Sequence, residues 1–218
     1  MRTEDTPDRI KYIQDLFAPQ DSVLQSIDNK IKLKEFPIHI GAEEGKFLQF
    51  LIKSLGVKSI VEVGTLAAYS TIWMARALPE NGKIYTIERS APRIELAKES
   101  IATLEKDTKD KIKLITGDAR KVLGELEGEF DMIFIDADKI SYLAYLDWAE
   151  KHIKKGGLIV GDNTFLFDAV YKDAPNEGIS NTAFIVMKEF NQRLADSSKY
   201  TGIMLPTKEG MTIARKEF

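Results

Sequence analysis

The sequence predicts an α/β fold with a doubly wound, mostly parallel sheet of seven strands that ends in an antiparallel hairpin. From Lys58 onward, short apolar runs alternate with amphipathic helical stretches, a pattern typical of parallel strands joined by helices. The end of the chain differs, because two strand-like runs flank the turn residues 206–209. That second pattern predicts the hairpin.

The strands predicted in the alternating region are residues 59–63, 83–87, 112–116, 131–136 and 158–160. The predicted helices are residues 70–78, 92–104, 119–126, 142–153 and 181–194. The hairpin strands are 200–205 and 210–214. Two amphipathic helices broken near Pro19 are expected in the first 35 residues, and a third from Ala42. We expect one domain, 1–218, in which residues 1–40 form an N-terminal helical extension.

The composition excludes several classes of protein. A net charge of −3 gives no general attraction to nucleic acid or anionic membranes. The absence of cysteine excludes disulfides, thiolate metal sites and cysteine nucleophiles, and it fits a cytoplasmic location, as does the polar start at Met1, which is unlike a signal peptide. His39 and His152 show no partner pattern, so a histidine-based hydrolase is not expected.

Acidic and amide side chains follow two of the predicted strands. Asp136 ends the run Phe-Ile-Asp-Ala-Asp-Lys, and Asp162 and Asn163 end the run Leu-Ile-Val-Gly-Asp-Asn. If these strands are neighbours, their carboxyl ends bring the three oxygen ligands together near Lys139. Such ligands suit Mg²⁺, Mn²⁺ or Ca²⁺. The alternative to a metal site is that Asp136 and Asp162 only cap helices and that Lys139 is a solvated lysine at a helix start.

Four polar or glycine positions at strand ends predict a second part of the site. Gly64 allows a sharp turn and a close approach to a ligand, and Ser70 begins a helix that can hold a carboxylate. Glu88 can accept hydrogen bonds from ribose hydroxyls, and Asp118 from an adenine amino group. Each also has an ordinary explanation as a turn glycine, a helix cap or a helix-start acid.

A dinucleotide site also explains Gly64 and Glu88, but its glycine-rich loop is missing. The motif Gly-x-Gly-x-x-Gly would need glycines where the chain has Leu66 and Tyr69. The sequence therefore favours a nucleoside cofactor without phosphate.

These segments resemble the cation-dependent O-methyltransferases of the caffeoyl-CoA and catechol type. The resemblance rests on Glu-Val-Gly-Thr at 62–65 with Tyr-Ser at 69–70, Ile-Asp-Ala-Asp-Lys at 135–139 and Asp-Asn-Thr at 162–164. Tyr142 and the segment 44–48 also look like the family. The resemblance implies the Rossmann-like class I methyltransferase fold, a homodimer, and methyl transfer from S-adenosylmethionine to an oxygen acceptor.

The resemblance also implies residue roles. Asp136, Asp162 and Asn163 would ligate the divalent cation, Mg²⁺ or Mn²⁺, and Lys139 would remove a proton, so the catalytic residues would be Lys139 and Asp136. The residues expected to line S-adenosylmethionine are Glu62, Gly64, Thr65, Ser70, Glu88, Asp118, Ala119, Asp136 and Asp138. Two departures stand near the pocket: Ala67-Ala68 replaces the usual Thr-Gly, and the segment after Thr164 is Phe-Leu-Phe.

Several acceptors fit this machinery. A catechol-like small molecule with two adjacent oxygens is preferred, because three protein ligands leave half of the six positions around Mg²⁺ open. A hydroxylated tRNA uridine or a protein carboxylate are the alternatives, the former kept open by two lysine-rich runs near residues 30–34 and 106–113. A non-enzymatic alternative is a protein that binds S-adenosylmethionine without catalysis.

Overall fold

The computed structural model describes residues 7–33 and 39–218 and forms two compact units. Of the described residues, the helical unit comprises 7–33, 39–58, Thr65–Ile84 and Ser90–Lys113. The sheet unit comprises Ser59–Gly64, Tyr85–Arg89 and Leu114–Phe218. Within the described ranges, no helix has both the length and the apolarity needed to cross a membrane.

The helical unit begins with the two expected helices. The helices of this unit are α1 (Pro7–Phe17), α2 (Ser22–Leu33), α3 (Ala42–Leu55), α4 (Tyr69–Ala77), α5 (Ala91–Ala102) and α6 (Lys106–Lys109). The apolar stripe of α2, made by Leu24, Ile27 and Ile31, is buried. The parts of the expected N-terminal extension at 1–6 and 34–38 lie outside the described residues.

Local capping explains where α3 begins and ends. The backbone N–H of Gly41 donates to the Glu44 carboxylate at 2.7 Å, so this side chain caps the first turn. Gly56 ends the helix with φ of 65°, the left-handed conformation that glycine adopts at low cost.

The sheet has the predicted seven strands, in the order β3-β2-β1-β4-β5-β7-β6. They are β1 (Ser59–Val63), β2 (Lys83–Glu88), β3 (Ile112–Thr116), β4 (Phe130–Ile135), β5 (Ile153–Asp162), β6 (Tyr200–Leu205) and β7 (Met211–Lys216). Strand β4 pairs in parallel with β1 and β5, whereas β7 runs antiparallel to both β5 and β6. The predicted fold class and the terminal hairpin are confirmed.

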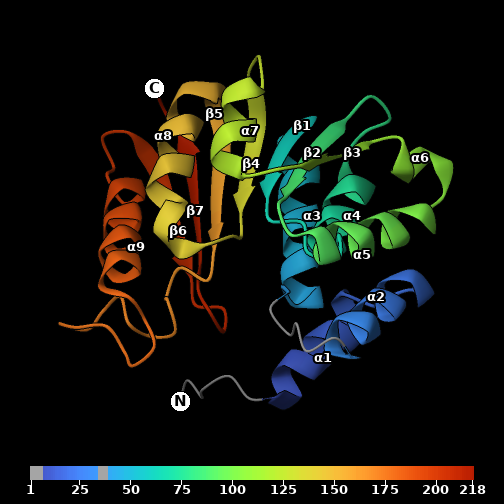
Figure 1. Cartoon of the computed structure of the whole chain (residues 1–218), viewed down its shortest axis with the longest axis horizontal. Helices are drawn as coiled ribbons and strands as arrows, with labels where there is room; N and C mark the ends of the chain where they lie inside the picture. The colour runs from blue at the N-terminus through green and yellow to red at the C-terminus, as the bar shows by residue number, and fades with distance from the viewer. Residues whose placement is uncertain (1–6, 34–38) are drawn as a thin grey trace. The chain divides into compact units, whose positions relative to one another are not determined.

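One face of this sheet packs on helices of its own unit. These are α7 (Ala119–Glu125), α8 (Tyr142–His152), preceded by the 3₁₀ turn Lys139–Ser141, and α9 (Asn181–Leu194). Alternate strand residues such as Val61, Ile133 and Ile159 are buried in one core with Tyr142 of α8 and Phe190 of α9. In Figure 1, α8 lies across β4 and β5. This packing fixes α8 against the strand ends.

Strand β5 is longer than predicted, and the preceding helix is shorter. The sequence predicts a helix to residue 153 and a strand only at 158–160, whereas α8 ends at His152 and β5 starts at Ile153. Between the pairs Phe130–Ile153 and Met132–Leu158 the register shifts, and Gly156 has φ of 82°. The Lys-Lys-Gly-Gly segment is thus a bulge within the strand. The short helix α6 was not predicted.

The direction of winding reverses between β1 and β4. The chain passes from β1 to β2 and β3 on one side and places β4 and β5 on the other. Ligands of open α/β sheets bind at such a reversal, outside the carboxyl ends of the strands.

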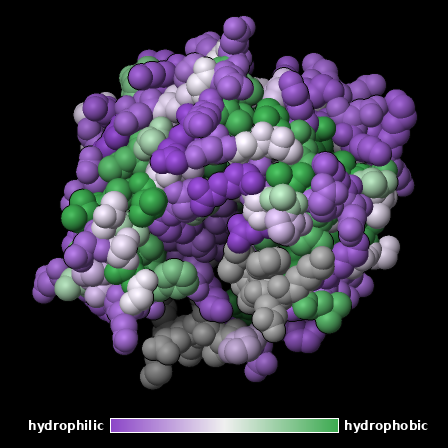
Figure 2. Space-filling model, viewed as in Figure 1, coloured by the Kyte–Doolittle hydropathy of each residue, from purple (hydrophilic) through white to green (hydrophobic). Residues whose placement is uncertain are grey.

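Hydrophilic residues make up much of the face shown in Figure 2, with hydrophobic patches between them. Large apolar side chains that stay exposed include Tyr12, Leu16 and Phe17 on α1 and Phe167 and Tyr171 after β5. Only the last two follow a strand end of the predicted site.

Candidate active site

Gly64 brings the ends of β1 and β4 into close contact. Its φ is 103°, and a Cβ at this position would lie 1.9 Å from the carbonyl oxygen of Asp136. Its N–H donates to the carbonyl oxygen of Ile87 at 3.0 Å. The N–H of Asp136 donates to the carbonyl oxygen of Val63 at 2.9 Å. A larger residue does not fit here, so glycine is required by the approach of two strands.

The predicted ligand residues gather around the amine of Lys139. Its Nζ lies 3.0 Å from Oδ1 of Asn163, 3.2 Å from the carbonyl oxygen of Asp162 and 3.6 Å from Oδ1 of Asp136. We call Asp136, Lys139, Asp162 and Asn163 the cation cluster. The ends of β4 and β5 thus deliver several oxygens to a single amine.

Burial governs the charge of this cluster. The side chain of Lys139 is only 15% exposed. Desolvation lowers the pKa of Lys139, while the carboxylates of Asp136 and Asp162 oppose that shift. An amine whose pKa is lowered in this way is suited to accept a proton.

The donor set of the cation cluster fits a hard divalent cation. Two carboxylates and an amide are oxygen ligands of the kind that Mg²⁺ and Mn²⁺ take. In the part of the chain that the structure describes, no cluster of three or more His, Cys, Asp or Glu side chains is arranged to hold a metal. The Asp-Asp-Asn set has two acids and an amide, and its role as a cation site stays a prediction.

The segment after Asn163 is conformationally unusual. Asn163, Leu166, Phe167 and Asp168 all have φ between 50° and 60°, the left-handed region that Asn and Asp tolerate but that Leu and Phe rarely adopt. The N–H of Thr164 donates to the carbonyl of Gly210 at 3.0 Å, which ties the segment to the turn between β6 and β7. Strain of this kind is often found at ligand sites.

The segment after Thr164 carries aromatic rings. Its sequence, Phe-Leu-Phe, is one of the two departures from the family pattern. Phe167 and Tyr171 are 61% and 66% exposed. The rings of Phe165 and Tyr171 meet edge to face with centroids 6.3 Å apart. The chain therefore presents an aromatic surface close to Asn163.

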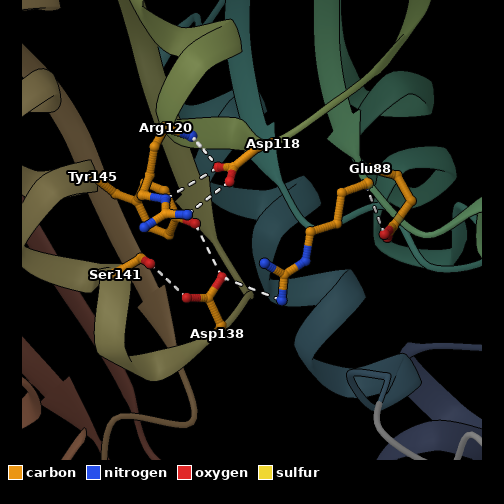
Figure 3. A network of polar contacts seen from close by, with 7 residues as sticks. Glu88, Asp118, Arg120, Asp138, Ser141 and Tyr145 are labelled. Carbon is orange, nitrogen blue, oxygen red and sulfur yellow. Dashed lines mark hydrogen bonds and ion pairs between the residues drawn. The ribbon is translucent and has the colours of Figure 1, made fainter. Parts of the chain in front are cut away.

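Asp138 lies in a separate network, shown in Figure 3. Ser141 Oγ and Tyr145 Oη donate to its carboxylate, the latter at 3.2 Å. The guanidinium of Arg89 lies 4.0 Å from its Oδ1. Burial, and then the charge of Asp138, raise the pKa of Tyr145 to about 12, so this phenol remains a donor at neutral pH.

Asp118 is held by a neighbour on its own helix. It caps α7 by accepting from the N–H of Arg120 at 3.0 Å, and the Arg120 side chain donates to both carboxylate oxygens, at 3.2 and 2.7 Å. This hydrogen bonding lowers the pKa of Asp118 to about 2. We call Arg89, Asp118, Arg120, Asp138 and Tyr145 the arginine network. The helix-capping alternative for Asp118 is realised, and the cofactor contact stays a prediction.

Three further predicted cofactor residues lie in the sheet unit. Glu62, on β1, is 0% exposed, and Glu88, at the end of β2, is 5% exposed and accepts from the N–H of Arg89 at 2.9 Å. Ala119 starts α7 and is buried. The N–H of Gly117 donates to the carbonyl of Glu88 at 2.9 Å, which joins the ends of β2 and β3.

Thr65 and Ser70 belong to the helical unit: Thr65 lies in the loop that leads into α4, and Ser70 is the second residue of that helix. Thr65 is buried, and its carbonyl accepts from the N–H of Ala68 at 2.8 Å. Leu66 and Ala68 have φ of 50° and 65°. The turn therefore forms without the glycine that the resemblance leads one to expect, with alanine in the left-handed conformation.

Sequence reasoning missed the groups that position the predicted carboxylates. Arg89 and Arg120 were not singled out, and neither were Ser141 and Tyr145. Ser141 lies three residues after Asp138, and Tyr145 lies one helical turn beyond Ser141. That spacing places them on one side of the new helix and would have pointed to them.

A family model described as O-methyltransferase matches residues 18–217. The chain belongs to the O-methyltransferase family. It is 41% identical over 157 residues to a catechol O-methyltransferase of Niastella koreensis, covering 70% of each chain. It is 32% identical over 184 residues to a caffeoyl-CoA O-methyltransferase of Populus kitakamiensis, covering 81% of this chain and 77% of the relative.

A solved structure gives the same result for the fold. The O-methyltransferase TomG of Streptomyces achromogenes, in complex with S-adenosylmethionine, superposes with a TM-score of 0.86 at 28% identity and covers 97% of this chain and 96% of its own. The predicted O-methyltransferase family, the class I fold and the enzyme class, an S-adenosylmethionine-dependent O-methyltransferase, are thereby confirmed.

Proposed function

We propose that this O-methyltransferase transfers a methyl group from S-adenosylmethionine to a small acceptor with two adjacent oxygens, and that it requires a divalent cation. The observation that carries the proposal is the cation cluster, where one buried amine contacts oxygens from the ends of both β4 and β5. The carboxylate and amide oxygens of this cluster are of the type that a hard cation takes as ligands.

Asp136, Asp162 and Asn163 would hold the cation. When bound, the cation would lower the acceptor's hydroxyl pKa and fix two adjacent oxygens by chelation. Catechol and caffeoyl groups carry such oxygens, and relatives named for them match most of this chain.

Lys139 would take the acceptor's proton. Its buried amine has a lowered pKa and lies within the cluster that would hold the acceptor. The exposed rings of Phe167 and Tyr171 support an aromatic acceptor, because planar rings pack well against other rings. This chain's own contribution is thus orientation, proton removal and packing.

The sheet unit holds the residues that would bind S-adenosylmethionine: Glu62, Gly64, Glu88, Asp118, Ala119, Asp136 and Asp138. For Thr65 and Ser70, cofactor binding stays a prediction. Asp138 is suited to the cofactor's amino group, because a carboxylate pairs with an ammonium. Glu88 is suited to its ribose, because an acid at this strand end accepts from hydroxyls. The sulfonium supplies the methyl group.

The test is transfer of radiolabelled methyl from S-adenosylmethionine to a dihydroxyphenyl compound, to total tRNA and to a cell-protein extract. Each acceptor is used with Mg²⁺ or Mn²⁺ and again with EDTA. Label on the dihydroxyphenyl compound that is lost with EDTA supports the proposal. Label that persists in EDTA contradicts the cation, and label confined to tRNA or protein contradicts the acceptor class.

Three expectations stay predictions beside this function: a single domain over residues 1–218, a cytoplasmic location and a homodimer. The exposed apolar side chains Tyr12, Leu16 and Phe17 on α1 support the homodimer, since such a stripe is suited to packing on another surface.

A further inference from the structure

Tyr142 is a fully buried residue whose phenol oxygen contacts Lys139 and Asp162 of the cation cluster. It begins α8 and is 0% exposed. Its phenol oxygen lies 2.8 Å from the carbonyl oxygen of Asp162 and 3.1 Å from that of Ile135. These two residues end β5 and β4, so one side chain bridges the ends of both strands.

The same phenol oxygen accepts a hydrogen bond from the amine of Lys139. The distance from Lys139 Nζ to Tyr142 Oη is 2.6 Å, the shortest contact that the structure gives for this amine. A phenol has one proton, which donates to the backbone carbonyls, and its lone pairs accept from Lys139. The hydrogen bonds therefore run in order from the lysine through the tyrosine to the strand ends.

Lys139 also contacts oxygens other than the phenol, among them the carbonyl oxygen of Asp162 at 3.2 Å. Oδ1 of Asn163 lies 3.0 Å and Oδ1 of Asp136 lies 3.6 Å from Nζ, and both belong to residues proposed to hold the cation. A buried ammonium that loses one partner moves toward those that remain. Without the phenol oxygen, Lys139 would move toward Asp136 and Asn163 and compete with a bound cation.

We propose that Tyr142 is a positioning residue, whose phenol oxygen holds Lys139 at the ends of β4 and β5 and limits its approach to the side-chain oxygens of Asp136 and Asn163. This inference rests on the proposed cation-dependent function. Its chemical consequence is that one side chain makes the lysine and the cation compatible in the same small space.

The test is Mn²⁺ binding, measured by titration calorimetry on the wild type, Tyr142→Phe, Lys139→Met and the double variant. Tyr142→Phe is expected to weaken Mn²⁺ binding by about tenfold, within the range seen when groups that orient ligands are removed. In the Lys139→Met background the same substitution is expected to change the affinity by less than about twofold, because no amine remains to compete.

Tyr145→Phe is the matched control, since it removes a phenol oxygen from the next turn of α8 that contacts Asp138 and not Lys139. Its Mn²⁺ affinity is expected to stay within about twofold of the wild type. Equal weakening by Tyr142→Phe in both backgrounds would show that Tyr142 only supports the strand ends, and an unchanged affinity in the single variant would also overturn the inference. A wild type that binds no Mn²⁺ overturns the proposed function itself, which keeps the two failures distinct.

Discussion

The cation cluster and the arginine network both place carboxylates at the strand ends, but they balance charge differently. In the cation cluster, one largely buried amine is shared among several oxygens. In the arginine network, Asp118 and Asp138 face guanidiniums whose side chains are 55% and 61% exposed. Solvent weakens charge pairs at the surface, so the same substitution is expected to cost more in the buried cluster.

The largest effect is expected from Asp162→Ala, which removes a proposed cation ligand. Turnover of the dihydroxyphenyl acceptor should fall more than about 100-fold, beyond the range for groups that merely orient ligands. Asp147→Ala is the control, because this acid on α8 is exposed and pairs with Arg193 at the surface. Steady-state rates at saturating S-adenosylmethionine measure both variants. Comparable rates for Asp162→Ala and Asp147→Ala would contradict the claim that the buried acid matters more to turnover than the exposed one.

Asp138→Asn is expected to have the next largest effect, on cofactor affinity. It removes the charge proposed to meet the amino group of S-adenosylmethionine while Ser141 and Tyr145 remain in place. A hydrogen bond to a charged group contributes about 1.5–3 kcal/mol, so the dissociation constant should rise by roughly 10- to 100-fold. Calorimetry measures it, together with Mn²⁺ affinity, which should not change. A cofactor affinity equal to the wild type's would place the amino group elsewhere.

A smaller and pH-dependent effect is expected from Arg120→Gln. Arg120 lowers the pKa of Asp118 to about 2, so the pair stabilises the fold above the ordinary aspartate pKa of about 3.8 and loses that contribution as the pH falls toward about 2. The wild type should therefore exceed the variant in urea resistance at pH 7, and the gap should narrow as the pH is lowered through this window. A gap that widens on acidification would contradict the assignment.

The smallest effect is expected in the helical unit, from Ala68→Gly compared with Ala67→Gly. Ala68 is left-handed, a conformation that costs about 1–2 kcal/mol for an L-residue, whereas Ala67 is not left-handed. Glycine should relieve the backbone strain at position 68. At position 67 it should lower the free energy of unfolding by about 0.5–1 kcal/mol. Thermal unfolding of the pair should therefore rank Ala68→Gly as the more stable. The reverse order would mean that the turn carries no strain.

The sequence was sufficient to predict the sheet, because strands depend on short-range pattern, whereas the cation-ligand role of the residues at their ends stays a prediction. Apolar runs marked the strands, and the position of Asp136 and Asp162 at their ends followed from a shared sheet edge. Strand β5 was predicted too short, because Lys-Lys-Gly-Gly has the composition of a loop, and its bulge depends on pairing with β4.

The positioning groups were harder to predict because they depend on side-chain direction in space. Arg120 reaches Asp118 only because α7 begins there, and Tyr142 reaches Lys139 only because α8 packs under two strand ends. A single sequence shows residue types and spacing, and it does not show which of several polar neighbours a long side chain selects.

The central claim is that the ends of β4 and β5 form a cation site, and direct Mn²⁺ binding tests it most simply. Electron paramagnetic resonance would count the ions bound to the wild type and to Asn163→Ala, which keeps both carboxylates. We expect a single bound ion in the wild type and a clear loss of affinity in the variant. No binding by the wild type, or equal binding by both proteins, would contradict the account.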